Sequence, residues 1–544
     1  MTAWRSGRTR VWALVLSCVV GACSGGAGGD DGLTPGPDPP ESLQQSARFL
    51  TQATFGPTSE EIERLAVIGY TAWFDAELAR APSLQRPNLQ QIEGDIYQSH
   101  RVNRWWRIAL QGQDQLRQRM AFALSEIFVV SDASGALSNE PLQLAEFYDV
   151  LARNALGDFR ELLEQVTLSP AMGLYLSMLR NRKADAAYNI RPDENYAREV
   201  MQLFTVGLVM LDPDGQPTDD GSGGTLPTYG QDQVEALARV FTGWNFADAQ
   251  YWDWTPHPSF RPMEPWEDYH DTDAKVLIGG QVIPPGGTAR ADLEQALDVL
   301  AAHPNVAPFI AKQLIQRLVT SNPTPAYVAR VASVFDDNGS GKRGDLFAVA
   351  RAILMDDEAR HGHQTLPNTF GKVREPLLRQ SALWRAFHAR SADGRVFDAW
   401  PEQDLGQAPQ RSPSVFNFFS PTHSPPGVAA NAGLVAPELQ IATDTLVTST
   451  ANRMWWLTLG GWQGAPWADE EQTLLQLGFE RSIADDSAAL LDHLDLLLMS
   501  GGMSSEMRAA IQSVVDAYDP SQRVERVVDA LYLIVTSPEF CVQK

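Results

Sequence analysis

The feature that most constrains the fold of this chain is the recurrence of apolar residues at helical spacing, in segment after segment. Residues three and four positions apart share one face of a helix, so each segment is expected to bury one side against its neighbours. Helices are predicted at 43–54, from 59, at 103–110, 115–130, 141–155, 159–168, from 170, at 192–207, 231–241, 290–302, 306–320, 325–335, 345–355, 375–389, 434–459, 486–499, 505–518 and 520–536. An all-α fold of many helices follows.

One short segment departs from this pattern. Residues 275–284 hold two apolar runs joined by two glycines, which is typical of a β-hairpin. Residues 212–230, rich in Gly, Pro and Asp, are predicted to be a long loop. The same is predicted for 244–270, with aromatic residues among prolines and acids, and for 401–426, rich in Pro, Ser and Phe. The predicted fold class is therefore all-α, with one small β-hairpin near 275–284.

The N-terminus has the pattern of an export signal. An apolar run at 11–20 follows the positive residues Arg5, Arg8 and Arg10. Val20-Gly21-Ala22-Cys23 resembles a lipobox, in which the signal peptide is cut before the cysteine and the cysteine is acylated. Residues 1–22 are thus predicted to be a lipoprotein signal peptide, with Cys23 as the lipidation site. The alternative is an ordinary cleaved signal with an incidental cysteine.

The rest of the chain divides into a tether and a large domain. Residues 23–42 are rich in Gly, Pro and Asp and are predicted to be a flexible tether. Residues 43–544 form the large helical domain, with a possible C-terminal helical subdomain at 433–544. Ser24 points, by resemblance to bacterial sorting, to the outer membrane of the cell envelope. No later segment is expected to span a membrane.

The composition limits the partners and the covalent links. The formal net charge is −24, so the surface is expected to repel phosphate backbones, and no nucleic-acid binding is predicted. The membrane link is expected to be the N-terminal lipid anchor. With Cys18 removed and Cys23 acylated, Cys541 is the one remaining cysteine, so no intramolecular disulfide is expected.

The predicted helix at 192–207 carries the densest set of ionisable groups. Asn195, Glu199 and Gln202 lie together beside its apolar edge, and Glu194 can pair with Arg198 four residues on. Glu199 could be a half-buried, working carboxylate. The alternative is an amphipathic helix with a solvated ion pair.

The loop at 244–270 concentrates aromatic residues, including Trp244, Trp252 and Trp254, among prolines and acids. Aromatic rings suit the C–H faces of sugars or other hydrophobic ligands, and nearby carboxylates could bind hydroxyls, so this loop could line a binding cleft. The alternative is that the rings cover one end of a helical bundle.

A polar cluster follows this loop directly. His270, Asp271 and Asp273 offer one imidazole and two carboxylates, a combination that suits a divalent metal. Glu199 or Glu194 could complete such a site. Two other interpretations are a polar or catalytic site without metal, and a structural role in which Lys275 pairs with Asp271 or Asp273.

Short motifs along the chain resemble, in their order, the bacterial family catalogued as domain of unknown function 1800, from about Ala47 to Phe540. The matching segments are 48–50, 53–57, 194–199, 238–239, 242–244, 270–271, 303–304, 343–346, 372–376, 411–416 and 537–540. Members are exported bacterial proteins whose genes often lie beside those of a sulfatase-like or phosphatase-like family. The resemblance therefore implies an exported protein with a possible partner of that kind.

Three functions are compatible with these patterns. The first is binding of an envelope or extracellular ligand, such as carbohydrate, in a cleft that would be lined by Glu194, Asn195, Arg198, Arg239, Trp244, Trp252, Trp254 and Lys275. The second is a hydrolase with Glu199 as general base or metal ligand, acting with His270 and Asp271. The third is an envelope scaffold without small-molecule chemistry.

Overall fold

The computed structural model describes residues 35–544 except 258, 467 and 470. The predicted signal peptide and Cys23 lie outside the described residues. The prediction of a mainly helical fold is confirmed, and most predicted helices are present. Within the described ranges, no helix is both long enough and apolar enough to cross a bilayer.

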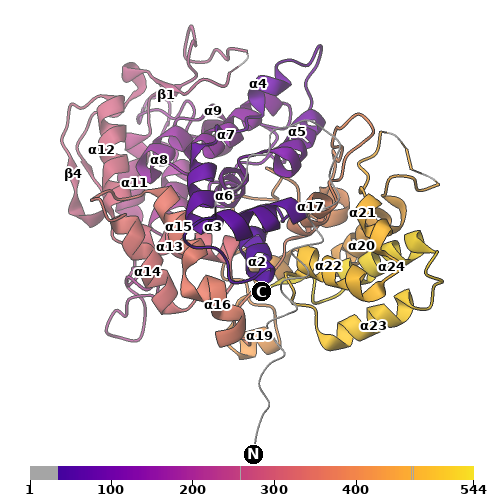
Figure 1. Ribbon diagram of the computed structural model, residues 1–544. Helices are drawn as coiled ribbons and strands as arrows, with labels where there is room; N and C mark the ends of the chain where they lie inside the picture. The colour runs from indigo at the N-terminus through magenta and orange to yellow at the C-terminus, as the bar shows by residue number, and fades with distance from the viewer. Residues whose placement is uncertain (1–34, 258, 467, 470) are drawn as a thin grey trace, which may run out of the picture.

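The helices run along the whole chain (Figure 1). In the first two thirds they are α2 (Leu43–Ala53), α3 (Ser59–Ala79), α4 (Arg86–Leu89), α5 (Gln98–Gln111), α6 (Gln115–Ser125), α7 (Pro141–Asn154), α8 (Phe159–Thr167), α9 (Pro170–Tyr175), α10 (Asn195–Glu199), α11 (Gln231–Val240), α12 (Ala289–Ala302), α13 (Val306–Leu318), α14 (Pro325–Asp336), α15 (Leu346–Met355) and α16 (Asp357–Thr365). In the last third they are α17 (Pro376–Ala386), α18 (Glu402–Leu405), α19 (Val428–Asn431), α20 (Asp444–Trp455), α21 (Gly478–Ile483), α22 (Ser487–Met499), α23 (Ser505–Val515) and α24 (Arg523–Val535).

Side-chain caps explain why several helices begin where they do. Thr58 and Glu61 form a capping box at the start of α3, in which each side chain accepts the other's backbone N–H. Asp158 accepts two backbone N–H groups in the first turn of α8, and Asp345 does the same at the start of α15. These caps satisfy donors that the helix itself leaves unpaired.

The helix predicted at 192–207 starts later and changes form. Its α-helical part is only α10, and the chain continues as the π-helix η1 (Val200–Thr205). The prediction that Pro192 begins the helix was wrong. Val200, Met201 and Phe204 remain buried on the apolar side of η1. Leu208 lies beyond the end of η1, after Gly207 at φ 71°, and is 55% exposed.

Two other helical predictions need correction. The segment 434–459 is not one helix, because the 3-10 turn η4 (Pro437–Gln440) precedes α20 and a π-helix, η5 (Trp456–Gly460), follows it. Helix α16 is not among the predicted helices. Its centre holds Gly362 and few apolar residues, so its sequence has no clear amphipathic period.

The predicted hairpin is confirmed. Strand β3 (Lys275–Val276) pairs with β4 (Val282–Ile283), with Lys275 opposite Ile283. The turn between them contains the 3-10 segment η3 (Ile278–Gly280), where Gly279 and Gly280 have φ of 64° and 73° and so need the freedom of glycine. Two further antiparallel pairs were missed: β1 (Trp244–Asn245) with β2 (Glu264–Pro265), and β5 (Lys372–Val373) with β6 (Val542–Gln543). Two-residue strands show no alternation in sequence.

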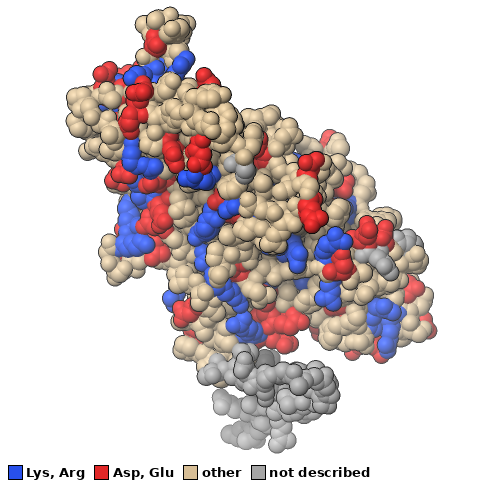
Figure 2. Space-filling model, turned by 90° about the horizontal axis from the view of Figure 1, so that it is seen from above, with Lys and Arg blue, Asp and Glu red and all other residues tan. Residues whose placement is uncertain are grey.

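One continuous hydrophobic core links the early and late helices. In Figure 1, α20 to α24 gather at one side of the molecule and α8 to α14 at the other. Helix α2 packs against α22, and the β5–β6 pair ties the chain end to the middle of the sequence. Figure 2 shows positive and negative side chains interspersed over one face, so on this face the acidic excess does not gather into a single patch.

Candidate functional site

Glu199 is buried at the end of α10, with 8% of the residue exposed. Its Oε2 has no hydrogen-bond partner among the described residues. Burial raises the pKa of Glu199 above its usual range. Burial, followed by the nearby Glu199 charge, raises the pKa of Tyr175 to about 12. The sequence therefore located a perturbed carboxyl, although its neighbours are tyrosines rather than the predicted imidazole.

The other charged groups of this helix are on the surface. Arg198 Nη2 lies 3.0 Å from Glu194 Oε2, which confirms the predicted pair. Gln231 donates to the same Glu194 oxygen at 2.9 Å. Both charged side chains are more than a third exposed, and Asn195 is exposed as well. This part of the predicted site is a solvated ion pair, which contributes little stability.

His270 belongs to a buried charge cluster. Its Nδ1 lies 2.9 Å from the carbonyl oxygen of Thr242, and its Nε2 lies 3.1 Å from Asp292 Oδ2. Lys275 donates to the same Asp292 oxygen at 2.7 Å. His270, Lys275 and Asp292 are each at most 2% exposed. The expected ion pair of Lys275 with Asp271 or Asp273 was wrong, because Lys275 reaches only their backbone carbonyls, at 2.5 and 3.1 Å.

The predicted metal ligands are not brought together. Asp271 accepts two hydrogen bonds from Arg239, at 3.0 and 3.2 Å, in a bidentate pair. Asp273 is exposed. Throughout the described part of the chain, no group of three or more His, Cys, Asp and Glu side chains is placed to hold a metal ion. None of the hydrogen bonds of His270 or Asp271 there reaches Glu199.

Most aromatic rings of the 244–270 loop pack against other side chains of the protein. Trp252 stacks on Tyr269 with ring centroids 3.9 Å apart, and the guanidinium of Arg290 lies 5.0 Å from the centre of the Trp244 ring. Trp244 is fully buried and Trp252 is 7% exposed, while Trp254 is half-buried. The Trp244 and Trp252 rings are thus covered, whereas Tyr251 in the same loop is 59% exposed. This arrangement matches the alternative in which the aromatics cover the end of the bundle.

A second cluster of buried charges was not predicted. It consists of Glu126, Glu375, Glu438, Arg119, Arg317 and Lys372, each no more than 4% exposed. Lys372 Nζ lies 3.1 Å from Glu438 Oε1 and 3.6 Å from Glu375 Oε1. Arg317 Nη2 donates to the carbonyl oxygen of Glu126 at 3.0 Å. Of this cluster, the sequence indicates only Lys372 and Glu375, as part of the family motif at 372–376. The helices that supply Glu126, Arg119 and Arg317 are predicted from their apolar residues, which say nothing of these charges.

The pKa values of two carboxyls in this cluster, Glu126 and Glu375, shift in opposite directions. Burial, and then the charge of Glu375, raise the pKa of Glu126 well above its usual range. Burial acts to raise the pKa of Glu375 too, but Lys372 and the hydrogen bonds from Glu126 and Gln407 outweigh it and lower that pKa. The shifts favour the protonated form of Glu126 and the ionised form of Glu375. A single negative charge on the pair lessens the repulsion between the two acids in the core.

The C-terminal part contains a cavity of about 410 Å³ with aromatic walls, here called the aromatic cavity. Phe397 and Trp456 line it and are 62% and 37% exposed. Polar groups come from the segment after η5, which supplies Asp469, Glu471 and Gln472. Unlike the 244–270 loop, this region therefore presents uncovered ring faces next to hydrogen-bonding groups.

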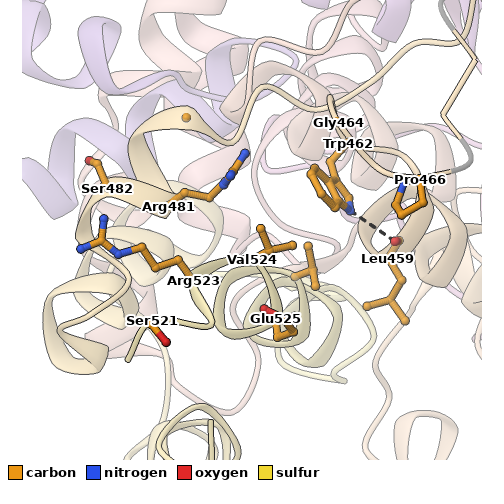
Figure 3. A pocket seen from close by; sticks show the side chains of 12 residues that line it. Leu459, Trp462, Gly464, Pro466, Arg481, Ser482, Ser521, Arg523, Val524 and Glu525 are labelled. Atoms are coloured by element: carbon orange, nitrogen blue, oxygen red, sulfur yellow. Dashed lines mark hydrogen bonds between the residues drawn. The ribbon is translucent and has the colours of Figure 1, made fainter. Parts of the chain in front are cut away.

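A larger cavity of about 780 Å³ lies between η5, α21 and α24 (Figure 3). Trp462 is its one aromatic residue among those drawn, and it is 8% exposed. Its indole Nε1 donates to the carbonyl oxygen of Leu459 at 3.3 Å, and the guanidinium of Arg481 lies 5.9 Å from the ring centre. The ring is thus covered and its N–H is used, so this cavity offers no open aromatic face.

Comparisons with known proteins identify the chain at the level of a family. A family model described as "Protein of unknown function (DUF1800)" matches residues 48–542, which is nearly the whole chain. No curated protein and no solved structure matches significantly. The resemblance expected from the motifs is thereby confirmed, over almost the expected span.

Proposed function

Since the chain belongs to the DUF1800 family of proteins of unknown function, we propose a function from its own geometry: it is a lipid-anchored cell-envelope protein that binds carbohydrate in the aromatic cavity. The observation that carries this proposal is the exposure of Phe397 and Trp456 on the cavity wall. Aromatic rings in soluble proteins are normally buried, and an uncovered pair beside polar groups is typical of a binding surface.

The chemistry of the wall suits a sugar. Sugar rings have C–H faces that pack on aromatic faces, and hydroxyls that bind carboxylates and amides. Asp469, Glu471 and Gln472 provide such groups on the same cavity. The volume of about 410 Å³ falls within the range of about 300–1,000 Å³ typical of small-molecule sites, so one or two sugar units are the expected occupant.

The test is binding of the purified protein to an array of glycans and cell-wall fragments, followed by calorimetric titration of each positive ligand. Trp456→Ala is expected to weaken binding at least about tenfold, since stacking on an aromatic ring is worth roughly 1–3 kcal/mol in comparable sites. Trp455→Ala is the matched control, because Trp455 is 47% exposed but projects about 100° further round the helix. A folded protein that binds no glycan would reject carbohydrate binding, and equal losses in both variants would reject the aromatic cavity as its site.

The location and the partner are parts of the same proposal. The lipobox-like sequence before Cys23 supports an acyl anchor, and the family resemblance supports a sulfatase-like or phosphatase-like partner. Mass spectrometry of the N-terminal peptide from the native host would detect the acylated Cys23. An unmodified N-terminus would contradict the anchor and leave the binding site to be judged separately.

A further inference from the structure

A third cavity, of about 170 Å³, lies where β5 leads into α17, opposite η4 and the start of α20. Its polar wall holds Arg374, Arg379, Glu438 and Cys541. We propose that this cavity, here called the arginine cavity, is a binding site for a short-chain aliphatic carboxylate. The proposal is independent of carbohydrate binding, because it rests on a different part of the molecule.

Arg374 is the strongest indication of an anionic ligand. The residue is 6% exposed, its Nη1 donates to the carbonyl oxygen of Leu498 at 3.1 Å, and its Nε has no hydrogen-bond partner among the residues that the structure describes. Burial lowers the pKa of Arg374 to about 10, so the guanidinium is still charged at neutral pH. None of the ion pairs within the described residues includes it. A buried cation without an anion is costly, and a ligand carboxylate would offset that cost.

Arg379 adds a second cation on the same wall. Its Nη1 lies 3.1 Å from Cys541 Sγ, and its buried Nε has no hydrogen-bond partner in the described structure. Two guanidinium groups provide N–H donors suited to the two oxygens of a carboxylate. The thiol also gives the cavity a reporter, because a bound ligand would restrict access to Cys541.

Glu438 is compatible with an anion because of its own surroundings. It is 3% exposed; its Oε1 lies 3.1 Å from Lys372 Nζ, and its Oε2 has no hydrogen-bond partner among the described residues. The charge of Lys372 offsets that of Glu438, which lessens the repulsion of a ligand carboxylate.

The opposite wall specifies the rest of the ligand. It is made of aliphatic side chains, those of Leu439, Ile441, Ala442, Leu446 and Val447. Leu439 and Val447 are 37% and 56% exposed, so the apolar side opens to solvent. The volume of about 170 Å³ is below the roughly 300 Å³ of the smallest typical drug-sized sites, which favours a chain of a few carbons. Charge at one end and a short apolar body at the other describe a molecule such as butyrate.

Two readouts test the proposal on the purified protein. The first is calorimetric titration with sodium butyrate, and with butan-1-ol and inorganic phosphate at the same ionic strength. The second is the rate at which iodoacetamide alkylates Cys541, followed by peptide mass spectrometry. Butyrate is expected to bind and to slow alkylation at least fivefold at saturation, while butan-1-ol and phosphate bind at least tenfold more weakly.

Variants locate the site. Arg379→Gln removes a cation, and Ala442→Phe fills the exposed side of the cavity; each is expected to weaken butyrate binding at least tenfold in a folded protein. Arg508→Gln is the control, because Arg508 pairs with Asp492 on α22, away from this cavity. The proposal is overturned if butyrate neither binds nor protects Cys541, if both cavity variants bind like wild type, or if butan-1-ol or phosphate binds as tightly as butyrate.

Discussion

Two regions of this protein are rich in aromatic residues, and they use them in opposite ways. In the 244–270 loop most rings pack inward, although Tyr251 is 59% exposed: Trp244 is fully buried and Trp252 lies against Tyr269 at 3.9 Å. Around the aromatic cavity the rings face solvent, with Phe397 62% exposed and Trp456 37% exposed. The first region was predicted to be the binding cleft, yet the second has the geometry of one.

The difference shows that aromatic density in a sequence does not by itself indicate a binding surface. What matters is whether other groups cover the ring faces. In the loop, Trp244 lies against Arg290 and Trp252 against Tyr269, whereas the Phe397 ring is 62% exposed and its backbone exchanges hydrogen bonds with the Thr473 hydroxyl at 2.7 and 3.3 Å. Rings of the first kind contribute to stability, and rings of the second kind remain available for ligands.

The largest effect expected from this comparison is on the stability of the loop. Trp244→Ala should lower the free energy of unfolding by about 3–5 kcal/mol, because it deletes a fully buried tryptophan that packs against Arg290. Urea unfolding monitored by circular dichroism measures the change. Trp254→Ala, at a half-buried position in the same loop, serves as the control and should cost clearly less.

If Trp244→Ala cost less than about 1 kcal/mol, the ring could not be a structural element of the loop. The contrast between the two aromatic regions would then fail, and the loop would again be a candidate cleft.

The acids of the aromatic cavity contrast with a buried acid elsewhere in the molecule, which leads to a prediction about pH. Asp469 and Glu471 on the cavity are exposed, whereas Glu77 on α3 is 2% exposed and accepts the backbone N–H of Leu116 at 3.0 Å. Burial raises the pKa of Glu77 from 4.5 to about 7. The folded state thus holds this proton more tightly than the unfolded state, and the associated stability is present below pH 4.5 and lost as the pH rises through about 7.

The expected size of this loss is about 3 kcal/mol, at about 1.4 kcal/mol per pKa unit. Glu77→Gln cannot ionise, so the stability of wild type relative to this variant should fall by that amount between about pH 4 and pH 8 in urea unfolding. Glu63→Gln, on an exposed face of the same helix, should show no such trend. If the difference in free energy of unfolding between wild type and Glu77→Gln stayed constant with pH, the pKa of Glu77 would be the same in the folded and unfolded states.

Much of the fold could be predicted because its determinants are local. Apolar spacing and caps such as Thr58 with Glu61 mark most helices, and two glycines mark the β3–β4 turn. The π-helix after Glu199 could not be predicted, because its hydrogen bonds depend on packing rather than on residue preference. The same holds for β5 and β6, whose partners lie about 170 positions apart in the chain.

The candidate sites depend on tertiary contacts, and there the sequence was a weaker guide. It identified Glu199 and the Glu194–Arg198 pair, since both follow from one helix. It could not foresee that Asp292, on α12, would take Lys275 and His270 away from a metal site. Nor could it place Arg374, Arg379 and Cys541 together, because that meeting requires the β5–β6 pair to bring the chain end back.

The smallest expected effect tests the other half of the comparison. Phe397→Ala should change the free energy of unfolding by no more than about 0.5 kcal/mol, because its ring is 62% exposed and its backbone bonds to Thr473 survive the substitution. The same variant should weaken the binding of any ligand that stacks on the rings of the aromatic cavity. Phe416→Ala, at another exposed phenylalanine, should affect neither property. A loss above about 2 kcal/mol on Phe397→Ala would show that the ring is covered in solution, and the aromatic cavity would then be a structural contact rather than a binding surface.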